Sequence, residues 1–188
     1  ERKERCGHRP LQIHQIPIIF CIISECLYET ERIMTEFVFG PYRLEVDVEA
    51  TRAYYAAHNE PWIICTCAGC RNFAQAVKLL PQPVKDFFAQ LGLDPEKVNE
   101  LCYYNGTEST VIGDCWYHLV GRVLEGSSQP GDYAEFPAGW YELVEGFSVG
   151  FKNACDLLPE DFPKPCFQMQ FNYTLPWLLE EKNPYAYE

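Results

Sequence analysis

The stretch CFQMQFNY, residues 166–173, alternates between apolar and polar side chains from its second residue onward. Successive side chains of an extended strand point to opposite faces. One face of this segment therefore carries Phe167, Met169, Phe171 and Tyr173, and the other carries Gln168, Gln170 and Asn172. This pattern predicts a strand of an antiparallel sheet.

Three other segments also predict strands. Residues 37–48 alternate in the same way, and residues 116–124 and 140–152 are rich in aromatic and β-branched side chains. The sequence YYNG at residues 103–106 is typical of a hairpin turn. The C-terminal half of the chain is therefore expected to form most of the sheet.

The middle of the chain predicts helices. Residues 49–58 are rich in alanine, and residues 68–80 and 84–91 have apolar side chains spaced three and four apart. Gly92 suits the C-terminal end of the last of these helices, and residues 94–101 begin like a further short helix. Together these segments predict a single α+β domain with an N-terminal strand, a helical middle segment and a C-terminal antiparallel sheet.

The domain is expected to span residues 34–188. Residues 1–33 show no sustained helix or strand periodicity, and Met34 is the first methionine. Residues 29–33 can be encoded by purine-rich codons that resemble a ribosome-loading signal before an ATG. We therefore expect translation to start at Met34 and residues 1–33 to be a non-native or poorly ordered extension.

The net charge of the chain limits the classes of partner that it can bind. Its 27 acidic and 15 basic side chains give a formal net charge of −12. Such a surface repels phosphate backbones and acidic membranes, so we expect neither nucleic-acid nor membrane binding. A basic protein is the partner that this charge favours. The ten cysteines are unevenly spaced and accompany an aromatic-rich core composition, which favours reduced thiols over a disulfide framework.

The run CTCAGC, residues 65–70, concentrates three thiols where a loop enters a predicted helix. Cys67 and Cys70 form a Cys-x-x-Cys pair that can chelate one zinc ion, and Cys65 can supply a third ligand. A structural zinc site has four ligands. The candidates for the fourth are Cys102, Cys115 and His118.

The same thiols have two other interpretations. The helix dipole and Arg71 would lower the pKa of a thiol at this helix start, which suits redox exchange. Alternatively, the cysteines are reduced, inert packing residues without any cofactor. The sequence leaves all three interpretations open.

The chain is poor in recognisable catalytic groups. It contains no nucleophile elbow, phosphate-binding loop, dinucleotide fingerprint or His-Glu-x-x-His motif. After Met34 only His58 and His118 remain, and His118 shares a predicted strand face with Trp116 and Val120, where we expect a structural histidine with a hydrogen-bond partner. We therefore predict a non-enzymatic acidic binding protein, for example an immunity-like or inhibitory module. The alternative is a thiol-based redox or zinc-containing protein centred on Cys67 and Cys70.

Several short motifs occur in a distinctive order: CxxCxNF at 67–73, LGLDP at 91–95, YHLVG at 117–121, and FxMxF with LPW at 167–177. In this order they resemble a family of short uncharacterised proteins from gut Firmicutes. The resemblance spans most of residues 42–181 and implies a cytoplasmic bacterial protein. It implies no activity, cofactor or catalytic residue. Cys65 is an addition to the family pattern.

Overall fold

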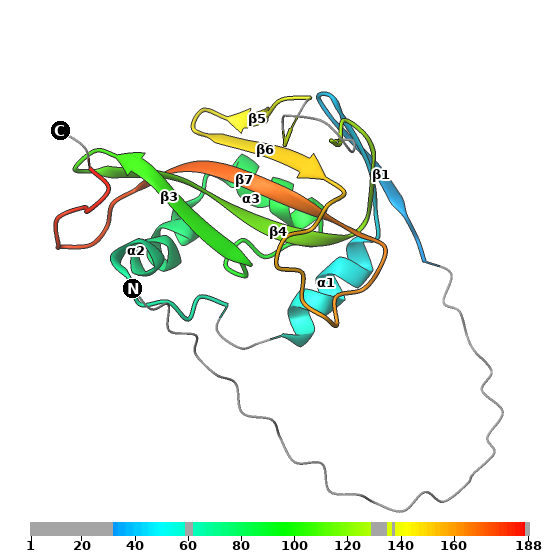
Figure 1. Ribbon diagram of the computed structural model, residues 1–188, viewed down its shortest axis with the longest axis horizontal. Helices are drawn as coiled ribbons and strands as arrows, with labels where there is room; N and C mark the ends of the chain where they lie inside the picture. The colour runs from blue at the N-terminus through cyan, green and yellow to red at the C-terminus, as the bar shows by residue number, and fades with distance from the viewer. Residues whose placement is uncertain (1–31, 59–61, 129–134, 137, 187–188) are drawn as a thin grey trace, which may run out of the picture. The chain divides into compact units, whose positions relative to one another are not determined.

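The computed structural model of the protein describes residues 32–58, 62–128, 135–136 and 138–186. Within these residues seven strands form one antiparallel sheet, whose strand order is β1-β2-β4-β7-β6-β5 with β3 beside β4 (Figure 1). The strands are β1 (Thr35–Phe39), β2 (Tyr42–Val46), β3 (Glu100–Gly106), β4 (Thr110–Glu125), β5 (Tyr141–Val144), β6 (Phe147–Lys152) and β7 (Cys166–Pro176). The predicted extension, residues 1–33, lies outside the described residues except for Arg32 and Ile33.

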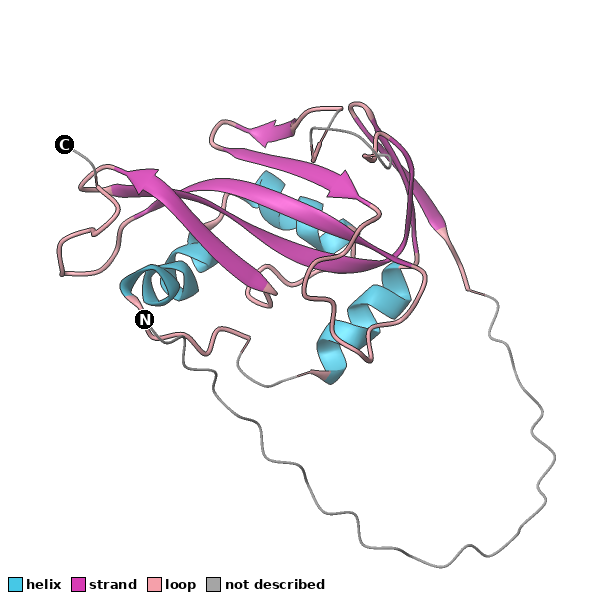
Figure 2. Ribbon diagram, in the orientation of Figure 1, coloured by secondary structure: helices cyan, strands magenta, loops and turns pink. Residues whose placement is uncertain are grey.

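Three α-helices and one short 3-10 helix lie among the described residues between β2 and β3 (Figure 2). They are α1 (Val48–Ala57), α2 (Ala68–Ala76), η1 (Val77–Leu79) and α3 (Gln82–Gln90). The α+β class, the helical middle and the antiparallel C-terminal sheet are thus confirmed. The N-terminal strands belong to the same sheet, because β2 pairs with the far end of β4.

The core lies between the apolar face of the sheet and helices α2 and α3. Phe88 of α3 contacts Tyr117 and Phe171 edge-on, with ring centroids 5.0 and 5.1 Å apart. Phe73 of α2 lies 5.5 Å from the ring of Tyr173. The predicted apolar face of β7 is therefore buried against the helices, with Phe167, Met169, Phe171 and Tyr173 all fully buried. Gln168 and Gln170 on the opposite face are buried as well.

Helix α1 fills a gap at the edge of β4. Strand β3 pairs with the first half of β4 and β2 with its end, which leaves the backbone of His118 and Val120 between them without a strand partner on this edge. The Val120 N–H donates to Thr51 Oγ1 at 3.0 Å, and the Asp47 N–H donates to the Val120 carbonyl at 2.8 Å. The Thr51 side chain and the backbone N–H of the N-cap residue, Asp47, thus replace a strand, which satisfies buried backbone groups.

Four predicted elements differ from the structure. The YYNG stretch predicted as a hairpin turn lies inside β3, and the chain turns between Gly106 and Thr110 instead. The strand predicted over 140–152 is the hairpin β5–β6. The single strand predicted over 37–48 is the hairpin β1–β2, because Gly40 adopts φ +54° and allows the chain to reverse. The short helix predicted over 94–101 is wrong: the segment forms turns, and β3 starts at Glu100. The Tyr117 hydroxyl donates to the Pro95 carbonyl at 2.8 Å, so this carbonyl is engaged by the core rather than by a helix.

Candidate functional site

The structure brings together the three thiols of residues 65–70. The Sγ atoms of Cys65, Cys67 and Cys70 all lie within 4.8 Å of one another. Cys65 belongs to the loop that follows α1, Cys67 is the N-cap of α2, and Cys70 lies in the first turn of α2. A loop residue and one helix turn therefore converge on one point.

The start of α2 explains this convergence. Cys67 has extended backbone angles, and its Sγ accepts a hydrogen bond from the Cys70 N–H at 3.5 Å, as an N-cap side chain does. The Arg71 N–H donates to the Cys67 carbonyl at 3.0 Å and closes the first helical turn. The Arg71 guanidinium donates to the Thr66 carbonyl at 3.1 Å, which holds the loop residue between the first two thiols.

The thiols differ in exposure and in acidity. Cys65 and Cys67 are exposed, whereas Cys70 is buried. Desolvation acts to raise the pKa of Cys67, but hydrogen bonds from the Cys70 backbone and from the other two thiols outweigh it, so the pKa is lowered. Burial raises the pKa of Cys70 to about 12, against a hydrogen bond from the Tyr103 hydroxyl at 3.6 Å.

Two tyrosines border the thiols. Tyr103 of β3 and Tyr185 of the C-terminal segment stack with ring centroids 4.9 Å apart. A Cβ atom at Gly69 would lie 2.5 Å from the Tyr103 ring and 2.8 Å from the Tyr185 hydroxyl. Glycine at this position is therefore what allows both rings to approach the N-terminus of α2.

A hollow of about 320 Å³ adjoins Cys65 and Cys70. Its other lining residues are Trp62, Ile63, Ile64, Val98, Asn99, Glu100 and Leu101. Ile64 is 85% exposed, so one apolar side chain stands open beside the thiols. The site thus combines soft sulfur donors with a mainly apolar surface.

The proposed fourth ligands do not join the three thiols. Cys102 pairs with Asp114 across β3 and β4, on the sheet face opposite the helices. Cys115 is fully buried, and its Sγ lies 3.7 Å from the Tyr117 hydroxyl. Among the described residues, the group of potential metal ligands at this point consists of the three thiols alone.

His118 belongs to a separate buried network that the sequence did not reveal. Its Nε2 donates to the Asp156 carbonyl at 3.1 Å, which confirms the predicted structural histidine with a partner. Lys152, 5% exposed, donates to the carboxylates of Asp156 and Glu135, and Gln168 accepts a hydrogen bond from the Asp156 N–H at 2.7 Å. In the sequence, the alternation of residues 166–173 placed Gln168 on the polar face of this strand. Alternation alone could not show that the loop containing Asp156 covers that face.

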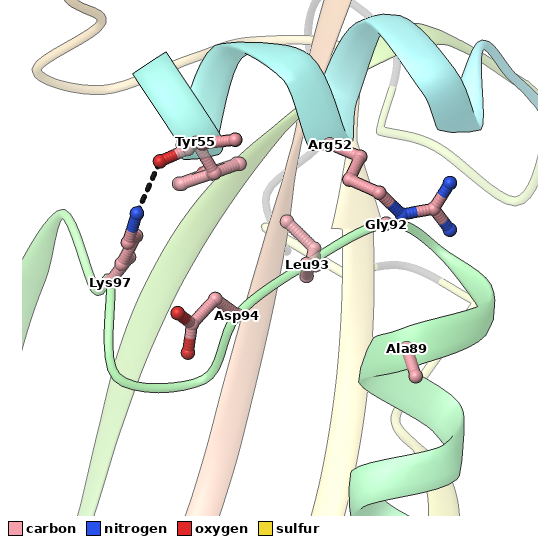
Figure 3. A pocket seen from close by; sticks show the side chains of 8 residues that line it. Arg52, Tyr55, Ala89, Gly92, Leu93, Asp94 and Lys97 are labelled. Atoms are coloured by element: carbon pink, nitrogen blue, oxygen red, sulfur yellow. Dashed lines mark hydrogen bonds between the residues drawn. The ribbon is translucent and has the colours of Figure 1, made fainter. Parts of the chain in front are cut away.

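A further hollow, of about 400 Å³, lies between α1 and the segment after α3 (Figure 3). Its two cations are already engaged. Lys97 donates to the Tyr55 and His58 carbonyls at the end of α1, and Arg52 pairs with Glu49. Lys97 therefore caps the C-terminal end of α1, where a cation interacts favourably with the helix dipole.

In comparisons with protein-family models, with curated proteins and with solved structures, nothing matched this chain. None of the described helices combines the length and the apolar character needed to cross a bilayer.

Proposed function

We propose that Cys65, Cys67 and Cys70 hold a zinc ion as three thiolates. The observation that carries this proposal is the mutual approach of all three Sγ atoms to within 4.8 Å. Zinc–sulfur bonds of about 2.3 Å in tetrahedral geometry place sulfurs about 3.8 Å apart, so small side-chain rotations close the site. The fourth position is filled by water or by an exogenous ligand.

Cys65 is the residue that favours metal binding over simple redox exchange. A dithiol pair needs only Cys67 and Cys70, and a third thiol from the preceding loop adds nothing to it. A metal ion uses all three donors and ties the loop to α2. Two exposed ligands also make the ion accessible, which is typical of a site with an exchangeable position.

The test is the zinc content of the chain purified under reducing conditions. We expect about one zinc per chain, lost in Cys65→Ser and in Cys67→Ser, and retained in the matched control Cys102→Ser, whose thiol lies outside the cluster. Zinc at a thousand times its Kd would raise the free energy of unfolding by about 4 kcal/mol, and chelation would remove this gain. A chain that takes up no zinc after reduction, or a Cys65→Ser variant that keeps it, contradicts the proposal.

Thiol–disulfide exchange is the second candidate, because an exposed Cys67 lies one helical turn from a buried Cys70. The Cys67 thiolate would attack a substrate disulfide and release one substrate thiolate. Cys70, after losing its proton, would then attack Cys67 Sγ and release the second. The substrate is reduced and the protein is oxidised to a Cys67–Cys70 disulfide.

One variant distinguishes zinc binding from thiol–disulfide exchange. Cys65→Ser abolishes zinc binding but leaves the Cys67–Cys70 equilibrium with a glutathione redox buffer unchanged. If the wild-type chain binds no zinc and the Cys65→Ser variant forms a Cys67–Cys70 disulfide, redox exchange is supported instead.

The acidic binding module remains a further proposal. Its support is the formal net charge of −12, which favours a basic protein partner, and an immunity-like or inhibitory role would be of this kind. The resemblance to a Firmicutes family and the cytoplasmic location also stay predictions. A pull-down from the native host at low salt that returns no basic partner would count against this module.

A further inference from the structure

Two of the three clustered thiols also line the hollow beside them. Cys65 and Cys70 belong to the lining of this hollow of about 320 Å³, and their Sγ atoms lie within 4.8 Å of each other and of Cys67 Sγ. A molecule seated in the hollow therefore faces the point where the three sulfurs converge. The volume lies at the lower end of the range for small-molecule sites, so the occupant is small.

A pair of tyrosines borders the thiols on another side. The Tyr103 hydroxyl donates to Cys70 Sγ at 3.6 Å, and the Tyr103 ring stacks on the ring of Tyr185. Both tyrosines lie against Gly69 in the first turn of α2, and neither lines the hollow. A hydroxyl donor beside a sulfur stabilises the thiolate that a metal ion requires. The hollow is an approach to the sulfurs that the tyrosines leave open.

Most of the lining is apolar, and parts of it are held by the core. Trp62 Nε1 donates to the His58 carbonyl at 3.2 Å, and the Trp62 ring lies 5.1 Å from the ring of Tyr55. Val98 is only 2% exposed. The apolar lining residues are Trp62, Ile63, Ile64, Val98 and Leu101. A preformed apolar lining favours an occupant with a hydrocarbon body.

The charge of the lining favours one kind of donor atom. The remaining lining residues are Asn99 and Glu100, so none of the described residues around the hollow is a cation. A carboxylate ligand is ionised at neutral pH and would lose its hydration beside Glu100 without a counter-ion. An alkyl thiol is neutral in water at this pH and loses its proton only on the metal, because a coordinating thiol is deprotonated. Sulfur also matches the soft donors already present.

We propose that this site binds a small apolar thiol, with its sulfur as the fourth zinc ligand and its hydrocarbon part in the hollow. The inference rests on the proposed zinc site. The incoming thiol replaces the water at the fourth position and releases its proton to solvent. Binding therefore involves neither oxidation nor reduction.

The test uses the full chain, reduced with a phosphine and loaded with Co²⁺ in place of zinc, because thiolate-to-cobalt charge-transfer absorption grows with each coordinated thiolate. The probes are benzyl mercaptan, 2-mercaptoethanol and benzyl alcohol, which has the same ring but no sulfur. We expect benzyl mercaptan to increase the absorption saturably, with about tenfold higher affinity than 2-mercaptoethanol, since its ring buries more apolar surface. Benzyl alcohol should leave the absorption unchanged.

Ile64→Ala tests the part played by the hollow. The Ile64 side chain is 85% exposed, so its truncation leaves the core intact. We expect benzyl mercaptan to bind about threefold more weakly and 2-mercaptoethanol to bind as before. The matched control is Leu79→Ala, which truncates a side chain that is 62% exposed and lies outside the hollow, and it should bind both thiols as the wild type does.

The cobalt spectrum recorded before any thiol is added separates this inference from the zinc proposal. A chain without thiolate-to-cobalt absorption overturns the zinc site and this inference with it. A chain that binds cobalt but does not respond to benzyl mercaptan, or loses the metal to it, overturns this inference alone. Equal affinities for the two thiols, or an unchanged affinity in Ile64→Ala, overturn the role of the hollow. A stronger response to imidazole than to either thiol overturns the choice of sulfur.

Discussion

The hydroxyl group of Tyr55 bridges the backbone of His118: it accepts from the His118 N–H at 3.1 Å and donates to the His118 carbonyl at 3.0 Å. One helix side chain thus does what a neighbouring strand would do. Tyr55 is 2% exposed, so water cannot replace it.

Tyr55→Phe should therefore leave two buried backbone groups of His118 unpaired. We expect the free energy of unfolding to fall by about 2–4 kcal/mol, measured by urea denaturation. The control is Tyr54→Phe, whose hydroxyl donates to an exposed carboxylate, Asp161, at 3.3 Å. The control should lose less than about 1 kcal/mol. Equal losses in both variants would show that the bridge to β4 is not what Tyr55 contributes.

The buried imidazole of His118 should make stability depend on pH. Desolvation lowers the pKa of His118 to about 4 from 6.5, although the Asp156 carbonyl and carboxylate favour the charged form and Lys152 opposes it. Because Nε2 donates to a carbonyl, a second proton would go to Nδ1, which has no partner among the described residues.

The unfolded chain therefore binds more protons between about pH 4 and 6.5, and stability falls as the pH drops through this window. From pH 7 to 4.5 we expect His118 to account for a loss of about 2–3 kcal/mol. His118→Gln keeps a donor for the Asp156 carbonyl but does not titrate, so its unfolding midpoint should vary less over this range. An unchanged pH dependence in the variant would refute the assignment.

Gly121 lies where β4 stops running beside helix α1 and begins to pair with β2. It adopts φ +140°, and a Cβ atom there would lie 2.0 Å from the Glu45 carbonyl oxygen of β2. Gly121→Ala should cost about 3 kcal/mol of unfolding free energy through strain and the disrupted β2–β4 pairing.

Gly139→Ala is the matched control for Gly121→Ala. Gly139 also has a positive φ, +82°, but a Cβ atom there would meet nothing within 4 Å. The control should lose only about 1 kcal/mol, the cost of the backbone conformation alone. Similar values for both variants would mean that the close approach of β2 is unimportant.

Cys155 and Cys166 form a second thiol pair, with Sγ atoms 3.9 Å apart. Mild oxidation with diamide should join them, since side-chain rotation can bring the two sulfurs to bonding distance. The crosslink should raise the free energy of unfolding by about 2–3 kcal/mol, because it closes a loop of the unfolded chain. Peptide mapping after alkylation gives the pairing, and Cys166→Ser is the control. Recovery of both cysteines as alkylated thiols after oxidation would contradict the prediction.

The sequence by itself determined the elements whose signal is local. The alternation from Phe167 to Tyr173 defined β7 and the face that packs on the helices, and the apolar spacing around Phe73 defined α2. Gly92, with φ +75°, ends the helix where the sequence placed its C-cap. The proximity of Cys67 and Cys70 was also predictable, because residues three apart meet at a helix start.

Tertiary structure decided what depends on distant partners. Cys65 joins the two helix thiols only because the loop after α1 folds back to α2. Cys102 and His118 do not join them because both lie on the sheet face opposite α2, and Cys115, on the helix face, is buried against Tyr117. The edge of β4 is completed by Tyr55, and the polar face of β7 is buried by segments far away in sequence. Periodicity records which side chains share a face, but long-range packing alone decides what covers that face and which polar groups remain unpaired.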